Sequence, residues 1–354
     1  MIEIREHNDL RAPDLVRAWD LLTGDGACPG LFSSRLWVTT WAAAFADGLA
    51  PAILVGFDGS EPVGLAPFFA GAGRTIQFPV NFLSHRGEIL VREGRGAAFG
   101  AAALAHLRKQ GLTAALHSVP RDSSTYAALR GSHRGAGYLT HEISGRVSPY
   151  VDIETSWDEY LASRPSRVTH EWRRKIRKAE REAHIAFRAL AADTDLDALV
   201  SDFAAVDARS WREGEGTSIG GRGVEGFYRD LTRALAEGGL LRAFWLEVDA
   251  RVVAFVYGAV FGGTYFALKT SFDEEFSKLS PGVVLFHEAI QWAFSAGLTR
   301  FDFVGETARW KEEWATGRRE HAAVMLYPTR PAGLAAYARD AWLKPLARRM
   351  GKRS

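Results

Sequence analysis

The fold is decided by residues 240–314, which read LLRAFWLEVDARVVAFVYGAVFGGTYFALKTSFDEEFSKLSPGVVLFHEAIQWAFSAGLTRFDFVGETARWKEEW. Three runs rich in β-branched and aromatic residues, at 242–248, 252–261 and 264–269, predict three strands. Ser280 at a cap position and Pro281 in the first turn predict the start of a helix, which should end near Gly297. A fourth strand is predicted at 299–303, followed by a polar loop.

The start of the predicted helix is a candidate site for the pyrophosphate of a ligand. The first amides of a helix have no partner within the helix, and they can donate hydrogen bonds to an anion bound at the helix N-terminus. The residues concerned are Ser280, Gly282, Val283, Val284 and Leu285.

The first half of the chain repeats this order of elements. Residues 52–57 and 63–69 predict a hairpin, 97–110 an alanine-rich helix, and 113–118 a strand. That strand follows Gly-Leu-Thr, as does the strand near residue 299. Two copies of one fold is the simpler interpretation, although any α/β chain can show such coincidences.

Several strings of the second half resemble those of the CelD/BcsL-like acyltransferases, a branch of the GNAT superfamily. They are Trp172-Arg173-Arg174-Lys175-Ile176-Arg177-Lys178, Phe272-Asp273-Glu274-Glu275-Phe276, Ser280-Pro281-Gly282, Phe301-Asp302-Phe303-Val304-Gly305-Glu306 and Trp310-Lys311-Glu312-Glu313-Trp314. The resemblance implies a GNAT fold, acyl-coenzyme A as donor and acyl transfer to an amine. The usual GNAT pyrophosphate loop is richer in small residues, and only Gly282 stands in that place here.

The fold predicted for the whole chain is therefore α/β (α+β), with two tandem GNAT-like domains that each contain a mixed sheet flanked by helices. Fem-type aminoacyl transferases, which the chain resembles more distantly, have such a tandem arrangement. The predicted domains are residues 1–150, a degenerate copy that shapes the acceptor pocket, and residues 151–330, which bind the donor and carry a basic helix at 164–184. Residues 331–354 are predicted to form a basic amphipathic helix and tail.

Composition limits the class of protein. The chain has 354 residues, 47% of them hydrophobic, and a net charge of only +2, so a polyanionic partner is not implied by the total. Cys28 is the only cysteine, which excludes an internal disulfide and a cysteine-based zinc site. The beginning of the sequence is charged, and no apolar run is long enough to span a membrane, so we expect a cytoplasmic enzyme.

A basic segment joins the two halves. Residues 164–181 contain eight Lys or Arg residues, and Trp172, Ile176 and Ala179 fall on one face of a helix. The segment is either a solvated linker helix or a helix that binds substrate phosphates through Arg173, Arg174, Arg177 and Lys178. In the first half, His85 and Arg86 are the residues that could reach an acceptor pocket, unless they are ordinary surface residues.

At the end of the chain, residues 334–349 place Tyr337, Trp342, Leu343 and Leu346 among basic residues, and Pro345 should end or kink the helix. Such a helix can lie on an anionic membrane surface, but we expect it to pack its apolar face on the body of the protein.

Direct attack by the amine fits the residues better than an acyl-enzyme, because no Ser-His-Asp order or nucleophile elbow occurs. Glu306, in the loop after the last predicted strand, is the first candidate for the general base, and Asp302 is the second. Each has an ordinary structural alternative: Glu306 as a solvated carboxylate, and Asp302 as a partner of a loop amide or of Lys311. Lys311 matches the lysine that ends the Fem-type motif and would stabilise an oxyanion or a phosphate. His287 and Glu288 lack further ligands, so no metal is predicted.

The predicted function is N-acyl transfer, most simply acetyl transfer from acetyl-CoA, to the amine of a sugar, an amino acid or a pathway intermediate. One alternative is a Fem-like transferase that uses aminoacyl-tRNA. Another is a non-catalytic accessory protein of polysaccharide biosynthesis. Peripheral membrane contact and the oligomeric state stay open at this point.

Overall fold

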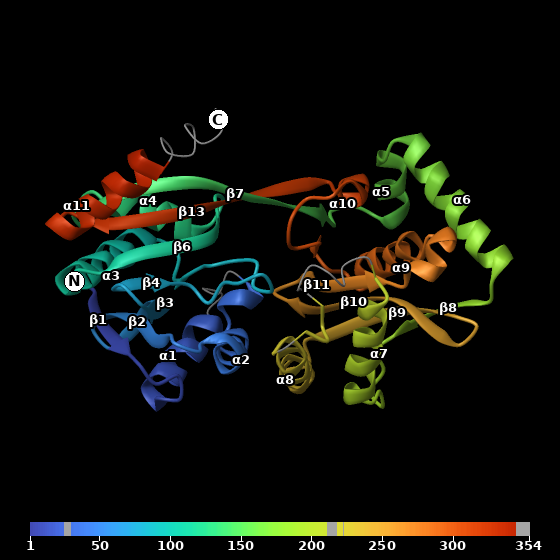
Figure 1. The fold of residues 1–354 in the computed structure, drawn as a ribbon, viewed down its shortest axis with the longest axis horizontal. Helices are drawn as coiled ribbons and strands as arrows, with labels where there is room; N and C mark the ends of the chain where they lie inside the picture. Colours follow the sequence, from blue (N-terminus) through green and yellow to red (C-terminus); the bar gives the residue numbers. More distant parts are fainter. Residues whose placement is uncertain (25–29, 211–217, 222, 345–354) are drawn as a thin grey trace. The chain divides into compact units, whose positions relative to one another are not determined.

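The computed structural model describes residues 1–24, 30–210, 218–221 and 223–344, and Figure 1 shows its fold. The chain divides into two compact units, residues 1–146 with 319–354, and residues 147–318. In each unit helices cover both faces of a mixed sheet, so the predicted fold class is confirmed.

In the first unit the strand order is β1-β2-β3-β4-β6-β13, with β5 paired to β3. Its β4–β6 pair is parallel, and its other described pairs are antiparallel. The elements are β1 (Glu3–His7), α1 (Pro13–Gly24), η1 (Leu31–Ser33), α2 (Arg35–Phe45), β2 (Ala50–Asp58), β3 (Glu61–Gly71), β4 (Thr75–Gln77), β5 (Leu90–Val91), α3 (Gly96–Gln110), β6 (Thr113–Pro120), α4 (Ser124–Ser132), β7 (Tyr138–Asp152), β13 (Gly317–Pro328), α11 (Pro331–Ala338) and η4 (Arg339–Leu343), a short π-helix.

In the second unit the strand order is β8-β9-β10-β11-β12-β7, and here β11–β12 is the parallel pair. The remaining elements are α5 (Trp157–Ser163), α6 (Ser166–Glu182), β8 (Ile185–Ala189), α7 (Leu196–Ala208), α8 (Val224–Glu237), β9 (Leu241–Val248), β10 (Arg251–Phe261), β11 (Thr264–Phe272), η3 (Glu274–Leu279), α9 (Pro281–Ser295), β12 (Arg300–Asp302) and α10 (Arg309–Trp314).

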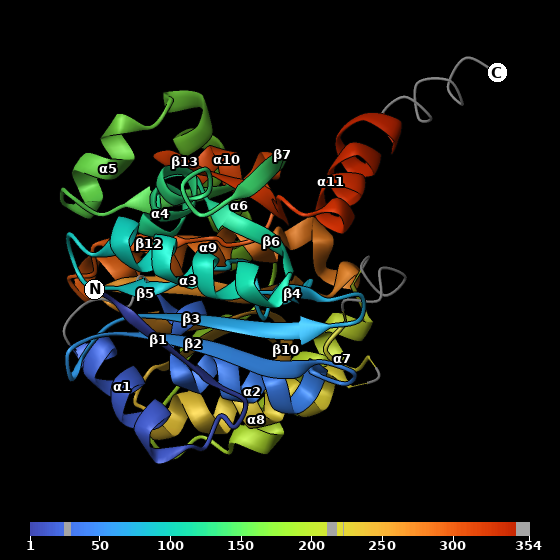
Figure 2. The same ribbon diagram turned by 90° about the vertical axis from the view of Figure 1, so that its left-hand side faces the viewer.

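The two units repeat one topology. In the first, a helix, α3, connects the parallel strands β4 and β6; in the second, α9 connects the parallel strands β11 and β12. The strands that follow the two Gly-Leu-Thr sequences therefore occupy equivalent places, as predicted. Figure 2 shows α3 on one face of the β1–β3 layer, with α1 and α2 on the other.

Each sheet is completed by a strand that is distant in sequence from the strand with which it pairs. The end of β7 pairs with β12 in the second unit, for example Asp302 with Tyr150. In return β13 pairs with β6 in the first unit, from His321 to Leu326. The two compact units meet at residues 146/147 and 318/319, so residues 319–330, which the sequence analysis assigned to the second domain, cluster with the first unit.

Helix α9 begins where the sequence predicts it, but for a different local reason. Ser280 occupies the N-cap position with a left-handed backbone (φ 54°), and its hydroxyl makes no capping hydrogen bond. Instead its N–H donates to the carbonyl of Ser277 in the preceding 3₁₀ turn. Pro281 follows at the first helical position, where its missing N–H costs nothing. The buried face of α9 packs in the core of the second unit with Phe301 and Phe303.

The C-terminal helix corrects one expectation. On its inner side the ring of Tyr337 contacts Tyr327, and Asp340 accepts a hydrogen bond from the Tyr327 hydroxyl at 2.9 Å. Trp342 and Leu343, however, are 67% and 61% exposed, so the apolar face is not packed on the body of the protein. Residues 345–349 of the predicted segment, and Cys28, lie outside the described residues.

A helix that crosses a bilayer needs about 18 apolar residues or more. None of the helices in the described ranges meets the length and apolarity that this requires.

Candidate functional site

The second unit contains a fork between two parallel strands. β12 pairs with β11 over three residues, from Thr264 opposite Arg300 to Phe266 opposite Asp302. β11 then continues to Phe272 along its other neighbour, β10. On the β12 side, residues 267–272 therefore have no neighbouring strand among the described residues, and such an edge can accept an extended ligand.

A pocket of about 280 Å³ opens at the end of this fork. It lies where β11 ends, η3 follows and α9 begins, and α10 closes its far side. The lining is mainly aromatic and apolar, with a few hydroxyls and one carboxylate: Thr270, Ser271, Phe272, Ser277, Ser280, Pro281, Gly282, Val283, Phe286, Trp310, Glu313 and Trp314. This is the composition of a small-molecule site, in which a few polar groups orient an otherwise apolar ligand.

The backbone at the start of α9 offers fewer amides than the sequence suggested. The N–H groups of Val283 and Val284 both point to the carbonyl of Ser280, at 2.9 and 3.4 Å. Leu285 lies within the regular helix. Gly282 is different, because a Cβ atom built on it would meet nothing within 4 Å, so open space lies beside its backbone.

The loop after β12 is held in an unusual conformation. Val304 is buried and has a left-handed backbone (φ 51°), which costs a β-branched residue about 1–3 kcal/mol. The Asp302 carboxylate accepts from the Val304 N–H at 2.9 Å, and the hydroxyl of Ser148 donates to the Gly305 carbonyl at 2.6 Å. Asp302 thus has a backbone partner in the loop, one of the two alternatives considered from the sequence.

Lys311 is the main support of this loop. Its side chain is buried, with 9% of the residue exposed, and Nζ donates to the carbonyls of Val304 and Glu306 at 2.9 and 3.1 Å, with a longer contact to Phe303. The backbone of the loop that carries Glu306 is therefore held by hydrogen bonds from a buried ammonium group. Glu306 itself is exposed. Its role as general base, and a role for Lys311 in chemistry, stay predictions.

The basic helix α6 packs beside α9 and η3. Trp172 stacks on Trp314 of the pocket wall, with ring centroids 3.5 Å apart and an angle of 10° between the planes. Lys178 donates to the carbonyl of Lys278, two residues before Ser280, at 2.9 Å. Helix α6 therefore contacts both α10 and the end of η3 beside the pocket. Its basic composition did not indicate these contacts.

The cations of α6 differ in their surroundings. Arg174 makes two hydrogen bonds to Glu171, at 2.8 and 2.9 Å, and holds the pKa of that carboxyl well below its usual range, at about 2. Arg173 and Arg177 are exposed, lie four residues apart on one face, and make no hydrogen bond or ion pair to described residues. Arg167, one turn or more before them on α6, is likewise exposed and has no such partner, so these three cations are available for a ligand.

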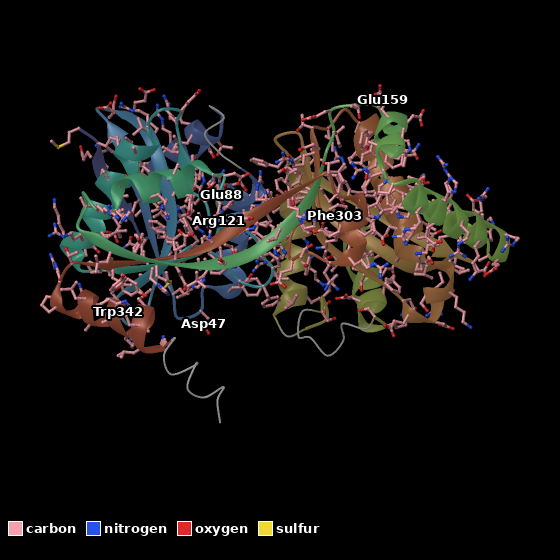
Figure 3. The ribbon with its side chains drawn as sticks, turned by 90° about the horizontal axis from the view of Figure 1, so that it is seen from above. Asp47, Glu88, Arg121, Glu159, Phe303 and Trp342 are labelled. Carbon is pink, nitrogen blue, oxygen red and sulfur yellow. The ribbon has the colours of Figure 1, made fainter. Side chains whose placement is uncertain are left out.

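In the first unit the predicted residues His85 and Arg86 are not simple surface residues. Arg86 and Glu88 are buried, and Nδ1 of His85 lies 2.8 Å from the guanidinium of Arg146. His321 belongs to the same neighbourhood and is 2% exposed. Burial, together with the nearby Arg86, lowers the pKa of His321 to about 4. Figure 3 marks Glu88 in this unit and Phe303 in the other.

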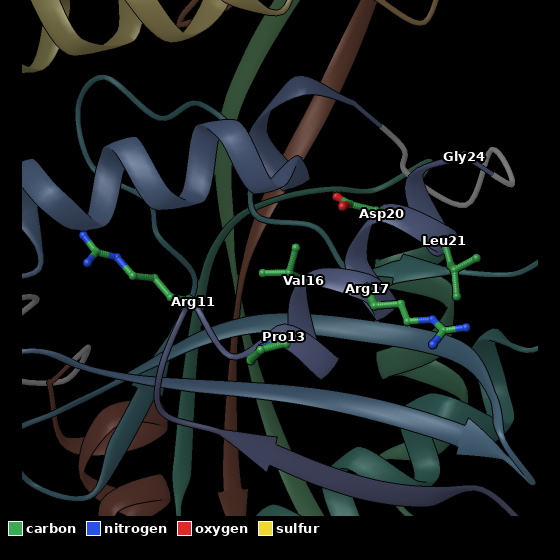
Figure 4. A pocket seen from close by; sticks show the side chains of 7 residues that line it. All are labelled: Arg11, Pro13, Val16, Arg17, Asp20, Leu21 and Gly24. Carbon is green, nitrogen blue, oxygen red and sulfur yellow. The ribbon is translucent and has the colours of Figure 1, made fainter.

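The first unit has a hollow along α1 (Figure 4). Its lining residues are Arg11, Pro13, Val16, Arg17, Asp20, Leu21 and Gly24. The side chains of Arg11 and Arg17 point away from each other in the figure, and Asp20 pairs with Arg35 at 3.1 Å. Its polar groups do not converge, so the hollow does not have the features of a ligand site.

His287 contacts its neighbour Glu288 at 3.2 Å. Within the described ranges there is no group of three or more His, Cys, Asp or Glu side chains that could hold a metal ion.

Comparison with known proteins gives one match to a family model, within the second unit of the chain. A model described as "Acetyltransferase (GNAT) domain" matches residues 166–312, which contain the fork, the held loop and most of the pocket. A search of curated proteins by sequence gives no match.

Solved structures are similar over almost the whole chain. FemX superposes with a TM-score of 0.66 at 14% identity, covering 95% of this chain and 98% of that chain. L-PGS from Bacillus licheniformis gives 0.59 at 14%, covering 93% and 95%. The C-terminal domain of a putative lysylphosphatidylglycerol synthetase from Agrobacterium fabrum gives 0.55 at 11%, covering 92% and 95%. At these identities the similarity establishes the fold, and the GNAT domain supports an acyltransferase.

Two residues of interest were missed from the sequence. Glu313 is the carboxylate of the pocket, and it stands in the quoted Trp-Lys-Glu-Glu-Trp string. The four-residue spacing of Trp310 and Trp314 on a helix could have placed Glu313 beside them. His321 could not have been found, because its surroundings come from segments more than 170 residues away.

We predict that replacing Lys311 lowers the stability of the protein, whereas replacing Glu306 does not. Lys311→Met leaves the carbonyls of Val304 and Glu306 without their buried donor, which should cost about 1–3 kcal/mol of unfolding free energy. Glu306→Gln changes an exposed side chain and should alter that free energy by less than about 0.5 kcal/mol. Urea unfolding of both variants measures the difference. Equal stabilities would show that the ammonium group does not hold the loop.

We also predict that His321 makes the stability of the fold depend on pH. Its pKa is lower in the folded protein than the 6.5 of an unperturbed histidine, so the unfolded state binds more protons as the pH falls. Stability should therefore decrease between pH 6.5 and about 4, by up to about 3 kcal/mol. In His321→Gln the unfolding free energy should fall less steeply over this range. The exposed His184→Gln is the control and should keep the parent's slope; a parental slope in His321→Gln would contradict the assignment.

Proposed function

We propose that this protein is an N-acyltransferase that transfers an acyl group, most simply acetyl, from acyl-CoA to an amine. The observation that carries the proposal is the fork between β11 and β12, which opens onto the pocket at the start of α9 inside the matched GNAT domain. The CelD/BcsL-like branch and a cytoplasmic location remain parts of the proposal that rest on the sequence.

In this proposal the extended arm of the donor lies along the unpaired edge of β11, where backbone groups can bind its amides. The phosphates lie near the open backbone at Gly282. The aromatic walls formed by Phe286, Trp310 and Trp314 exclude water from the neighbouring part of the donor.

The reaction itself needs no covalent enzyme intermediate. The nitrogen of the neutral amine attacks the acyl carbon, an N–C bond forms, and the C–S bond breaks. The amine gives its proton to a carboxylate, and the departing thiolate takes up a proton to leave as the thiol. Glu306 on the held loop is the proposed base, and Glu313 in the pocket wall is its competitor.

The runner-up is a Fem-like transfer of an aminoacyl group from tRNA. It is favoured by the whole-chain similarity to FemX, and by Arg173 and Arg177 on α6, which are exposed and have no partner among the described residues. The carboxylate of Glu313 also suits the free amine of an aminoacyl group better than it suits a phosphate. A non-catalytic accessory protein, the third possibility, would retain the fold without turnover.

The decisive experiment presents the protein with acyl-CoAs and aminoacyl-tRNAs, each with a panel of amines, and follows donor loss by mass spectrometry. Consumption of acyl-CoA supports the proposal, and consumption of aminoacyl-tRNA alone replaces it with the runner-up. If neither donor is consumed or bound, the accessory role is favoured.

Gly282→Val tests the position of the donor. The added side chain has open space in the free protein, so folding should be unaffected, but it would fill the place of the donor phosphates. We expect coenzyme A affinity to fall by about tenfold or more in calorimetry. Gly226→Val, in the first turn of α8, also adds a side chain into open space and is the matched control. Unchanged affinity in Gly282→Val would refute this placement.

Arg173→Gln with Arg177→Gln tests the basic face of α6. Stability should change by less than about 1 kcal/mol per charge, because both side chains are exposed. If the face holds substrate phosphates, binding should weaken and its salt dependence should become shallower. Both donor and acceptor binding should be measured, because α6 also contacts the donor pocket. An unchanged affinity and salt slope for both substrates would leave α6 as a solvated connector.

A further inference from the structure

The outer face of the C-terminal helix is unusually apolar. Leu334, Trp342 and Leu343 are 45%, 67% and 61% exposed. They are three of the seven large apolar side chains that are exposed among the described residues, and they fall within ten consecutive positions. Leu334, Ala338 and Trp342 are spaced by four, so they lie along one side of the helix.

This orientation is fixed from the opposite side. Tyr337 and Asp340 both contact Tyr327 of β13, the first by an edge-on ring contact and the second by a hydrogen bond. Arg339 and Lys344 pair with Asp340 within the same segment, at 2.9 Å, and the ring of Trp342 lies edge-on to Tyr337 with centroids 6.3 Å apart. The two contacts to Tyr327 therefore hold the helix to the first unit, while Trp342 and Leu343 stay largely exposed. Figure 2 shows α11 at the periphery of that unit.

Positive charge is concentrated at the same end of the chain. Residues 339–354 contain six basic residues, Arg339, Lys344, Arg348, Arg349, Lys352 and Arg353, against the single acid Asp340, which gives +5. Because the whole chain has a net charge of +2, the other 338 residues carry a net charge of −3. The charge asymmetry is therefore a property of this segment and not of the protein as a whole.

We propose that this face, Leu334 to Lys344, docks on the surface of an anionic lipid bilayer. Exposed Trp and Leu side chains can enter the headgroup region, where the indole ring has both an apolar body and a polar N–H group. Basic residues next to them are attracted by anionic headgroups, and several such residues add up to useful affinity. Binding of this kind holds a protein at the surface and needs no spanning segment.

A second copy of the chain is a less suitable occupant. Residues 339–354 of each copy carry a net charge of +5, and like charges oppose the association of two such segments. A bilayer rich in anionic lipid satisfies both the apolar and the charged part of the surface.

The test is co-sedimentation of the full chain with vesicles of phosphatidylglycerol and phosphatidylcholine, and with vesicles of phosphatidylcholine alone. The parent should bind the anionic vesicles, and 0.5 M NaCl should weaken this binding, a salt level of about a 4 Å Debye length. Trp342→Ala with Leu343→Ala should reduce the partition coefficient by about tenfold or more. Leu21→Ala with Ile143→Ala removes two exposed apolar side chains elsewhere in the first unit and should bind like the parent.

Thermal unfolding of each variant is the folding control, and all variants should unfold near the temperature of the parent because the changed side chains are exposed. The proposal is overturned if the parent does not bind anionic vesicles, or if the Trp342 and Leu343 double variant binds as well as the parent. It is also overturned if that variant loses self-association in light scattering while its vesicle binding is unchanged, because the face would then join copies of the chain. The assay contains no acyl donor or acceptor, so its outcome is independent of the proposed acyl transfer.

Discussion

The early separation of β12 from β11 is the constraint on which the second unit depends. The two strands pair for three residues, after which the chain turns away through left-handed conformations at Val304 and Gly305. That turn is unfavourable for valine by itself, and buried polar groups hold it in place: the Asp302 carboxylate, the Lys311 ammonium and the Ser148 hydroxyl. Local strain is thus offset by a specific set of partners, and the result is an open strand edge beside a pocket.

Much of this arrangement could be predicted from the sequence. The strands near 242–248 and 252–261 and the helix from Pro281 were predicted within a few residues, because apolar periodicity and proline chemistry are local signals. The paired Gly-Leu-Thr strands revealed the internal repeat for the same reason. The exchange of β7 and β13 was not predicted, because strand partners are chosen by long-range packing that leaves no mark on either strand alone.

The roles of individual site residues were harder to predict than the elements that carry them. Lys311 was considered for chemistry, yet its ammonium group is used on backbone carbonyls, which depends on a loop conformation that the sequence does not reveal. Glu313 was quoted in a motif but not chosen, although it lines the pocket. Trp172 was assigned to an apolar stripe, and it proved to stack on Trp314 and so to connect α6 with the pocket wall. In each case the residue type indicated that the side chain mattered, but the sequence did not indicate which group it contacts.

The exchanged strands have a consequence for the order in which the chain can fold during synthesis. All the strands of the second unit's sheet are present once β12 has been made, because β7, the partner of β12, comes before the other strands of that sheet in the sequence. The first unit lacks the neighbour of β6 until residues 321–326 leave the ribosome, about 200 residues after β6 itself. During that interval β6 presents an unpaired edge, which is the kind of surface that chaperones cover and that aggregation exploits. The part of the protein made first is therefore the last to be finished.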